Sequence, residues 1–230
     1  MQKLFDSKKI AAAAYIIAAS FLAIYAAAEI IPEFFLSTAG RLFLLCGCCI
    51  FMWLGGFWIS KAVGSNGPMR INLRIYLGLF LLLFATLTLF DPLWGRNGGF
   101  VNWTKELFAE YIQNSFNPVP FRTIISYLQK GTAYQIMVNI AGNLACLMPL
   151  GILLPLCFEK QKKPLAFLLA CAGISAGVEI LQFATLSGSC DIDDLILNVC
   201  GAFLMFGIAK IRSVEKILRQ VLLLEKGDPA

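Results

Sequence analysis

The sequence contains no histidine, and only 14% of its 230 residues are charged. The absence of histidine excludes a Ser-His or Cys-His catalytic pair and a typical zinc site. Neither an internal repeat nor a pair of broken helices is visible, which disfavours a small transporter, and no low-complexity linker marks a second domain. The scarcity of charge also departs from the composition of a soluble domain of this length.

Apolar residues make up 59% of the chain and are concentrated in six long runs. Each run approaches the roughly 20 residues that an α-helix needs to cross a bilayer core. We therefore predict an all-α, polytopic transmembrane bundle of about six helices. Pro149 and Pro155 predict a kink, rather than a break, in the fourth of them. The predicted helices cover residues 10–31, 42–63, 71–90, 136–158, 164–186 and 193–211.

Basic residues predict the orientation of these helices. Of the 19 Lys and Arg residues, 14 lie before the first helix, at or beyond the end of the last one, or in or within four residues of alternate connections between them. Because cytoplasmic loops are enriched in Lys and Arg, both termini are expected in the cytoplasm. The first apolar run is too long for a typical signal peptide, so we expect a retained anchor.

Two segments outside the runs are predicted to lie on the membrane surface. The aromatic-rich loop 91–135 is expected on the outer side, with one short helix capped by Asn102 and a second that begins near Pro120. Beyond the last helix, Ser213 is expected to cap a basic amphipathic tail on the cytoplasmic leaflet. The predicted regions are 1–90 (three helices), 91–135 (outer loop), 136–211 (three helices with polar residues) and 212–230 (tail).

Eight cysteines are present, and seven of them lie within apolar runs. There we expect them to behave as small hydrophobes rather than as a disulfide framework or a metal site. Cys190 falls instead at the outer boundary of the sixth predicted helix.

Polar side chains recur on one face of each of the last three predicted helices. Carboxylates and amides at membrane depth cost a few kcal/mol or more to desolvate, so they mark a candidate functional site. Spacings of three or four residues place each set on one helix face, and short connections make the three helices neighbours. We therefore predict one polar pocket that opens outward. Its expected ligand-binding residues are Asn139, Asn143, Glu179, Gln182, Asp191, Asp194 and Asn198.

Simpler roles for several of these residues stay open. Asp191 or Asp193 can cap the sixth helix and complement its dipole. Asn139, Asn143 and Gln182 can form interhelical hydrogen bonds without any ligand.

Glu179 is the hardest of the polar residues to explain by structure alone. Together with Asp194 it is our candidate for catalysis. Glu179, Asp191 and Asp194 also form a candidate set of oxygen ligands for Mg²⁺ or Ca²⁺.

Four sequence blocks surround these residues, in the order Asn139-Ile-Ala-Gly-Asn143, Met148-Pro-Leu-Gly-Ile-Leu-Leu-Pro155, Val178-Glu-Ile-Leu-Gln182 and Asp191-Ile-Asp-Asp-Leu-Ile-Leu-Asn198 with Gly201. Together they resemble the signature of VanZ-like membrane proteins. The upstream stretch Asn117-Pro-Val-Pro-Phe-Arg-Thr-Ile124 is similar to that family's Asn-rich, Pro-Phe motif, so the family-like region spans 117–207. Many relatives carry an arginine just before the aspartates, where this chain has Ser187-Gly-Ser-Cys190. That departure leaves Arg122 as the candidate for binding an anion.

The resemblance implies a multi-pass protein of the bacterial cytoplasmic membrane. It also implies a contribution to resistance to teicoplanin and related lipoglycopeptide antibiotics, or to homeostasis of the cell envelope. We expect the pocket to bind a membrane lipid, a lipid-linked cell-wall precursor or the glycopeptide drug, and we expect no nucleic-acid partner. The alternative is a divalent-metal-dependent membrane enzyme that acts on a phosphate of an envelope lipid.

Overall fold

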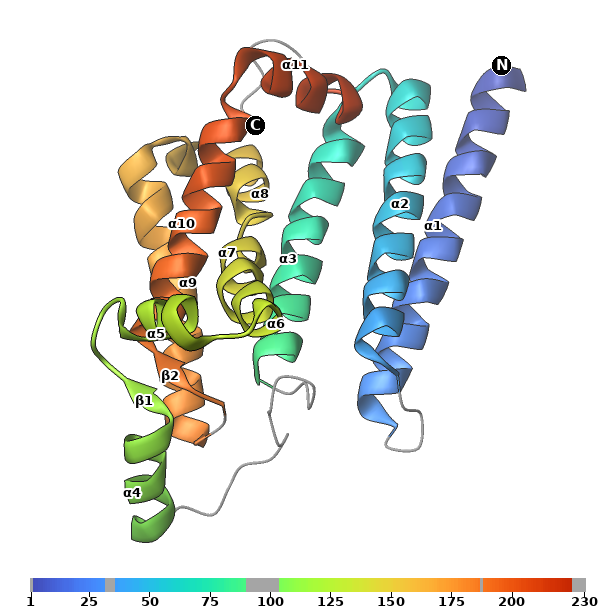
Figure 1. Ribbon diagram of the computed structural model, residues 1–230. Helices are drawn as coiled ribbons and strands as arrows, with labels where there is room; N and C mark the ends of the chain where they lie inside the picture. The colour runs from blue at the N-terminus through green and yellow to red at the C-terminus, as the bar shows by residue number, and fades with distance from the viewer. Residues whose placement is uncertain (1, 32–35, 90–103, 187, 225–230) are drawn as a thin grey trace. The chain divides into compact units, whose positions relative to one another are not determined.

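The computed structural model describes residues 2–31, 36–89, 104–186 and 188–224 (Figure 1). This part of the chain is helical except for its connections and one pair of two-residue strands. The prediction of an all-α polytopic bundle is confirmed. Six helices within the described ranges are long and apolar enough to cross a membrane: Leu4–Ala28, Ala39–Val63, Gly67–Leu89, Ala133–Cys157, Pro164–Thr185 and Ile192–Ala209.

The chain divides into two compact units. One consists of Met1–Leu79 and Glu215–Ala230, and the other of Phe80–Val214. Each unit exposes large apolar side chains, for example Ile16 and Phe43 in the first and Leu165 in the second. Since a soluble protein seldom exposes so much apolar surface, lipid is the expected environment.

The first unit is built on the antiparallel helices α1 (Gln2–Ile30) and α2 (Thr38–Val63). Ala11, Ala14 and Ala18 are buried, and their spacing puts these small residues on one face of α1, where they allow a close approach. Helix α3 (Gly67–Leu89) begins in this unit and continues into the second one.

The last helix, α11 (Arg212–Val221), lies mostly in the first unit. The indole Nε1 of Trp53 on α2 donates to the Val221 carbonyl at 2.9 Å, which attaches the end of α11 to α2. Helix α11 has charged and apolar residues at helical spacing, and the placement of the tail on a membrane leaflet stays a prediction. Ser213 does not cap α11, however, because the helix already begins at Arg212.

The second unit is arranged around α10 (Ile192–Ala209), which contacts α7 (Gly142–Cys146), α8 (Leu150–Cys157) and α9 (Pro164–Thr185). Gly201 permits the closest of these approaches, since a Cβ there would overlap the carbonyl of Leu144. The remaining elements are α4 (Lys105–Asn114), β1 (Phe116–Asn117), α5 (Arg122–Lys130), α6 (Ala133–Gln135), the π-helix η2 (Ile136–Ala141), the 3-10 helix η3 (Glu159–Lys162) and β2 (Cys190–Asp191).

The fourth spanning segment is divided into pieces, whereas the sequence predicted a single kinked helix. It runs through α6, η2 and α7, makes a turn at 147–149, and resumes as α8. Pro149 has no N–H to donate, so the α-helical ladder is interrupted there. Hydrogen bonds between residues three apart replace the α-helical ones at this turn. One example is the bond from the Leu150 N–H to the Leu147 carbonyl at 3.0 Å.

The two short helices of the loop 91–135 start close to where they were expected. Thr104 caps α4 by accepting the Leu107 N–H at 3.2 Å, and the expected cap Asn102 lies outside the described residues. Helix α5 begins at Arg122, two residues after Pro120, and its exposed face carries Phe121, Ile125 and Leu128.

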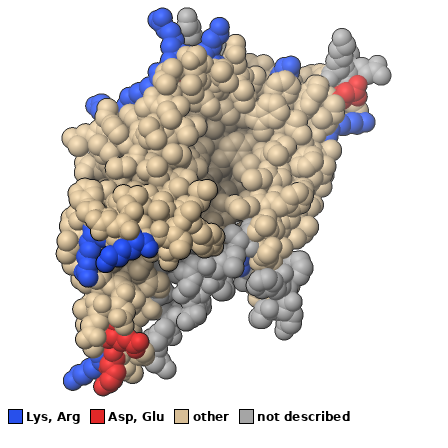
Figure 2. Space-filling model, in the orientation of Figure 1, with Lys and Arg blue, Asp and Glu red and all other residues tan. Residues whose placement is uncertain are grey.

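Charged side chains are sparse along the helices. The face shown in Figure 2 is mostly uncharged, with Lys, Arg, Asp and Glu gathered toward helix ends and short helices. In the second unit, the Lys210 ammonium after α10 donates to the Lys162 carbonyl before α9 at 3.1 Å, so these two basic stretches meet at one end. The cytoplasmic placement of such ends stays a prediction.

Candidate functional site

The site forms where two distant segments pair as parallel strands. Phe116 pairs with Cys190 and Asn117 pairs with Asp191. The sequence Asn117-Pro118-Val119-Pro120 favours this geometry, because a residue that precedes proline is restricted to extended conformations. The strand pairing therefore brings residues 116–120, which follow α4, against the N-terminus of α10.

Asp191 connects three elements. Its Oδ1 accepts the Asp193 N–H at 2.8 Å and thereby caps α10, which was one of the predicted alternatives. The same oxygen accepts the Asn117 amide at 2.9 Å, and Oδ2 accepts the Thr123 hydroxyl at 2.5 Å. Asp191 thus joins α10 to both β1 and α5, which is more than a local cap would do.

Asp193 caps a different helix from the one expected. Its side chain is fully buried, and it accepts the backbone N–H groups of Phe121 at 2.5 Å, Thr123 at 2.7 Å and Ile124 at 3.1 Å. These groups belong to the N-terminus of α5, which has no side-chain cap of its own. A carboxylate at this position also complements the helix dipole.

The remaining polar residues join helices to one another. Glu179 on α9 accepts the Asp191 N–H at 2.9 Å. Asn143 on α7 donates to Asp194, and Asn198 on α10 donates to the Ser175 hydroxyl of α9 at 3.1 Å. Glu179 therefore binds the end of β2, whereas Asn143 and Asn198 make separate interhelical bonds.

Gln182 and Asn139 differ in what they bind. The Gln182 amide donates to the Thr88 carbonyl of α3 at 2.9 Å, whereas Asn139 donates to the Gln135 carbonyl of its own segment. Interhelical bonding thus holds for Gln182 and not for Asn139. In the described part of the chain, Gln182 Oε1 and Asn198 Oδ1 are buried without a hydrogen-bond partner.

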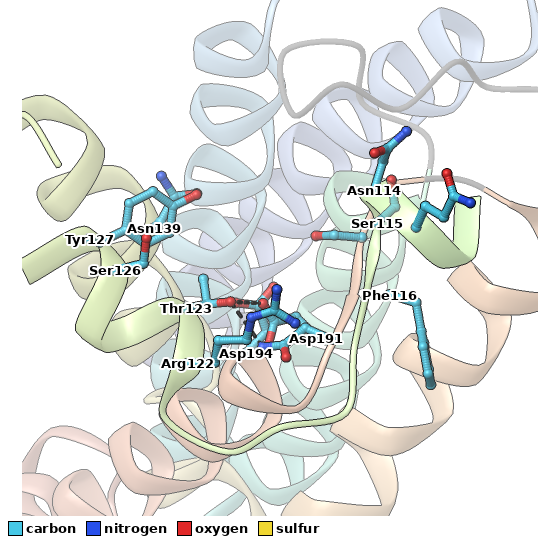
Figure 3. A pocket seen from close by; sticks show the side chains of 13 residues that line it. Asn114, Ser115, Phe116, Arg122, Thr123, Ser126, Tyr127, Asn139, Asp191 and Asp194 are labelled. Atoms are coloured by element: carbon cyan, nitrogen blue, oxygen red, sulfur yellow. Dashed lines mark hydrogen bonds between the residues drawn. The ribbon is translucent and has the colours of Figure 1, made fainter. Parts of the chain in front are cut away.

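A polar cavity of about 360 Å³ lies beside the strand bridge (Figure 3). Four predicted ligand-binding residues line it, namely Arg122, Asn139, Asp191 and Asp194. Arg122, Asp191 and Asp194 gather at one place in the cavity, while Ser126, Tyr127 and Asn139 lie together at another. The other lining residues are Gln113, Asn114, Ser115, Phe116, Asn117, Thr123 and Ser189.

An apolar cavity of about 390 Å³ adjoins the polar one. Phe116, Asn117 and Asp191 line both cavities, so the strand bridge is their common wall. The second cavity also contains Glu179 and a set of mostly apolar residues: Pro118, Ala176, Ile180, Phe183, Cys190, Ile192 and Leu195.

The aromatic ring of Phe183 anchors the apolar side of the site. Its centroid lies 5.9 Å from that of Phe108, 6.0 Å from Tyr111 and 5.6 Å from Phe116. Such ring pairs contribute roughly 0.5–1.5 kcal/mol each beyond the burial of their surface. The cluster thereby holds α4 and β1 against the end of α9.

The carboxylates of the site affect the pKa of two neighbouring groups. Burial raises the pKa of the Tyr127 hydroxyl, and the carboxylates of Asp194 and Asp191 raise it further. Burial likewise raises the pKa of the Cys190 thiol to about 11, with smaller effects from Glu179 and Asp191. Arg122 is the only Lys or Arg that lines the polar cavity, and its guanidinium has no hydrogen-bond or ion-pair partner among the described residues.

A protein-family model described as VanZ/LLP1 matches residues 77–213, more than half of the chain. The chain belongs to the VanZ/LLP1 family. The match begins before the stretch 117–207 identified from the sequence, and it includes the end of α3 that binds Gln182. Comparison with curated proteins and with solved structures gave no match. Together with its six apolar helices, the family match makes this chain a multi-pass membrane protein.

Within this VanZ/LLP1 segment, the residues that the sequence did not indicate include two that bind the Asp191 carboxylate. Asn117 and Thr123 were quoted only as part of a family-like motif, yet both contact Asp191 and line the polar cavity. The motif itself was the available signal. Its side chains acquire a role only when β1 pairs with β2.

The structure gives no direct support to a metal centre in the VanZ/LLP1 segment. No group of three or more His, Cys, Asp and Glu residues is arranged to hold an ion in residues 104–186 and 188–224, or elsewhere in the described chain. Glu179, Asp191 and Asp194 each accept a hydrogen bond from the protein instead. Binding of Mg²⁺ or Ca²⁺ stays the alternative hypothesis for these carboxylates.

Proposed function

We propose that this VanZ/LLP1 protein binds an amphiphilic ligand at the outer face of the bacterial cytoplasmic membrane. The ligand is a membrane lipid, a lipid-linked cell-wall precursor or an acylated glycopeptide antibiotic. Binding of this kind would lower the access of lipoglycopeptides such as teicoplanin to their target, or maintain the envelope.

The observation that carries the proposal is the common wall of a polar and an apolar cavity. An amphiphile needs both environments within one molecular length, and Phe116, Asn117 and Asp191 face both. Burial of a chain in the apolar cavity would contribute about 0.8 kcal/mol for each CH₂ group removed from water.

The polar cavity suits a head group that carries both hydroxyl or amino groups and an anionic group. Carboxylates of Asp191 and Asp194 can accept hydrogen bonds from the former. The guanidinium of Arg122 presents donors that match a phosphate or carboxylate. These complementary groups support a zwitterionic or partly anionic head group.

The test compares Arg122→Gln with Lys130→Gln in cells that express the protein. Both changes remove one positive charge from α5, but only Arg122 lines the polar cavity. We expect Arg122→Gln to raise teicoplanin susceptibility and Lys130→Gln to leave it at the wild-type level. A glycopeptide without an acyl tail serves as the comparison drug.

Mass spectrometry of the purified protein provides a second readout. The wild type should retain an amphiphile that is depleted in Arg122→Gln and in Ile180→Asp, which places a charge in the apolar cavity. If both variants retain the same molecules as the wild type, the proposal is wrong.

A further inference from the structure

A separate cavity of about 460 Å³ lies within the first unit, between the C-terminal ends of α2 and α11. We infer that this cavity, here called the basic cavity, binds the phosphate group of an anionic membrane lipid. Its polar lining includes Ser60, Lys61, Asn66, Arg219 and Gln220, and Leu223 contributes an apolar edge. The two helices thus contribute one cation each, Lys61 from α2 and Arg219 from α11.

The hydroxyl of Ser60 is the most specific indication of a ligand. Ser60 is only 5% exposed, and among the described residues its Oγ has no hydrogen-bond partner. A buried hydroxyl without a partner costs about 1–3 kcal/mol, so a bound acceptor would recover that energy. A phosphate oxygen in the cavity is such an acceptor.

The walls of the basic cavity are fixed by contacts within one unit. The bond from Trp53 to the Val221 carbonyl attaches α11 to α2. The guanidinium Nε of Arg219 pairs with Glu215 at 2.9 Å, and the Lys61 ammonium lies 4.2 Å from the ring centroid of Phe57. Both cations are therefore oriented before a ligand arrives, which reduces the entropy that binding must offset.

Two helix C-termini at this place oppose an anion, because each carries roughly half a negative charge. Their last carbonyls are satisfied locally, since Ser60 O accepts Gly64 N at 2.9 Å and Arg219 O accepts Leu224 N at 2.8 Å. Basic residues also outnumber acidic ones at this end of the unit, where the described acids are Asp6 and Glu215. The described basic residues there are Lys8, Lys9, Lys61, Arg70, Arg74, Lys216 and Arg219.

A lipid fits this site better than a soluble phosphate because of its position. The cavity begins where the membrane-spanning stretch Ala39–Val63 ends, which is the level of lipid head groups. Val63 is exposed there, and Leu223 lines the cavity, so acyl chains would have apolar surface to contact.

The experiment titrates the full-length protein in neutral detergent with phosphatidylglycerol and follows binding by native mass spectrometry. Lys61→Gln and Arg219→Gln should each remove one charge-assisted hydrogen bond to the phosphate. Each substitution should therefore weaken phosphatidylglycerol binding roughly tenfold or more. Lys216→Gln is the matched control, because Lys216 is exposed on α11 and does not line the cavity. Equal loss in Lys216→Gln and Lys61→Gln would overturn the proposal in favour of a general surface charge effect.

Ser60→Ala distinguishes a ligand-binding hydroxyl from an unused one. We expect this variant to unfold at the same or a higher temperature without lipid, since it removes an unpartnered polar group, and yet to bind phosphatidylglycerol less tightly. Unchanged lipid affinity in Ser60→Ala would contradict the proposal.

Two further arms identify the source of the phosphate. Phosphatidylcholine should bind more weakly than phosphatidylglycerol, and millimolar inorganic phosphate should not displace the lipid. Displacement by inorganic phosphate would show that a soluble anion occupies the cavity, and equal affinity for phosphatidylcholine would show that anionic charge is not recognised. Either result overturns the assignment to an anionic lipid.

Discussion

The carboxylate of Asp193 accepts the backbone N–H of Thr123 at 2.7 Å, although the two residues are 70 positions apart in the chain. This bond means that α10 supplies the cap that α5 lacks. Since α5 carries Arg122, Thr123, Ser126 and Tyr127 into the polar cavity, Asp193 controls the geometry of the cavity without lining it.

The cap gives the first prediction. Asp193→Ala should destabilise the docked α5 by about 2–4 kcal/mol, because it removes a helix cap and leaves buried N–H groups without an acceptor. Hydrogen exchange of amides 123–130 should accelerate while that of α9 stays slow. Asp194→Ala, one position away, is the control and should leave α5 protected. Unchanged exchange in Asp193→Ala would show that α5 is held by other contacts.

The close approach of α7 and α10 gives the second prediction. Gly201→Ala places a Cβ against the backbone carbonyl of Leu144. Because the contact is with backbone atoms and not with a flexible side chain, the neighbour cannot easily move aside. We expect a loss of at least about 2 kcal/mol in stability, measured by thermal unfolding in detergent. Gly207→Ala on the same helix meets nothing within 4 Å, and its expected effect is neutral or slightly stabilising. Equal effects of the two substitutions would contradict the packing argument.

The environment of Cys190 gives the third prediction. With a pKa of about 11, compared with 9.0 for the unperturbed thiol, the reactive thiolate should be about 100-fold scarcer near pH 7. Alkylation of Cys190 by a membrane-impermeant maleimide should therefore be slow at pH 7 and rise about tenfold per pH unit until about pH 11. The rate of alkylation rises with pH because burial and the nearby carboxylates disfavour the thiolate and so raise the pKa of Cys190.

The same reagent also tests orientation. Labelling of Cys190 should occur in intact cells, since this end of the bundle is predicted to face outward. Ser189→Cys combined with Cys190→Ser is a suitable control, because residue 189 is more exposed and should react faster. Protection of both positions in intact cells, with labelling in inverted vesicles, would reverse the predicted orientation.

Chelation gives the fourth prediction. An ion bound by Glu179, Asp191 and Asp194 would have to displace the donors that these carboxylates already engage, so we expect EDTA to leave the unfolding temperature of the purified protein unchanged. A decrease that Mg²⁺ or Ca²⁺ reverses in the wild type, but not in Glu179→Gln, would establish the metal site. Loss of cellular function in both Glu179→Gln and Asp194→Asn, at normal protein levels, would then favour the enzyme alternative.

The spanning helices were predictable because of what a bilayer demands. Backbone groups in lipid must be hydrogen-bonded within the segment, so the length of an apolar run alone defines a helix. The predicted runs 42–63 and 164–186 correspond closely to α2 and α9. The segmented form of 136–158 was not predictable, since whether a proline bends or interrupts a helix depends on which neighbours satisfy the freed groups.

The sequence by itself determined the all-α membrane architecture, the family and a group of costly polar residues near one end of the last helices. Only the tertiary structure decided what each of these residues does. Asp191 and Asp193 are two positions apart, yet the first caps its own helix and the second caps α5. Local spacing fixes which side chains share a helix face, but the partner of a buried carboxylate is set by where a distant segment folds back, here through the pairing of β1 with β2.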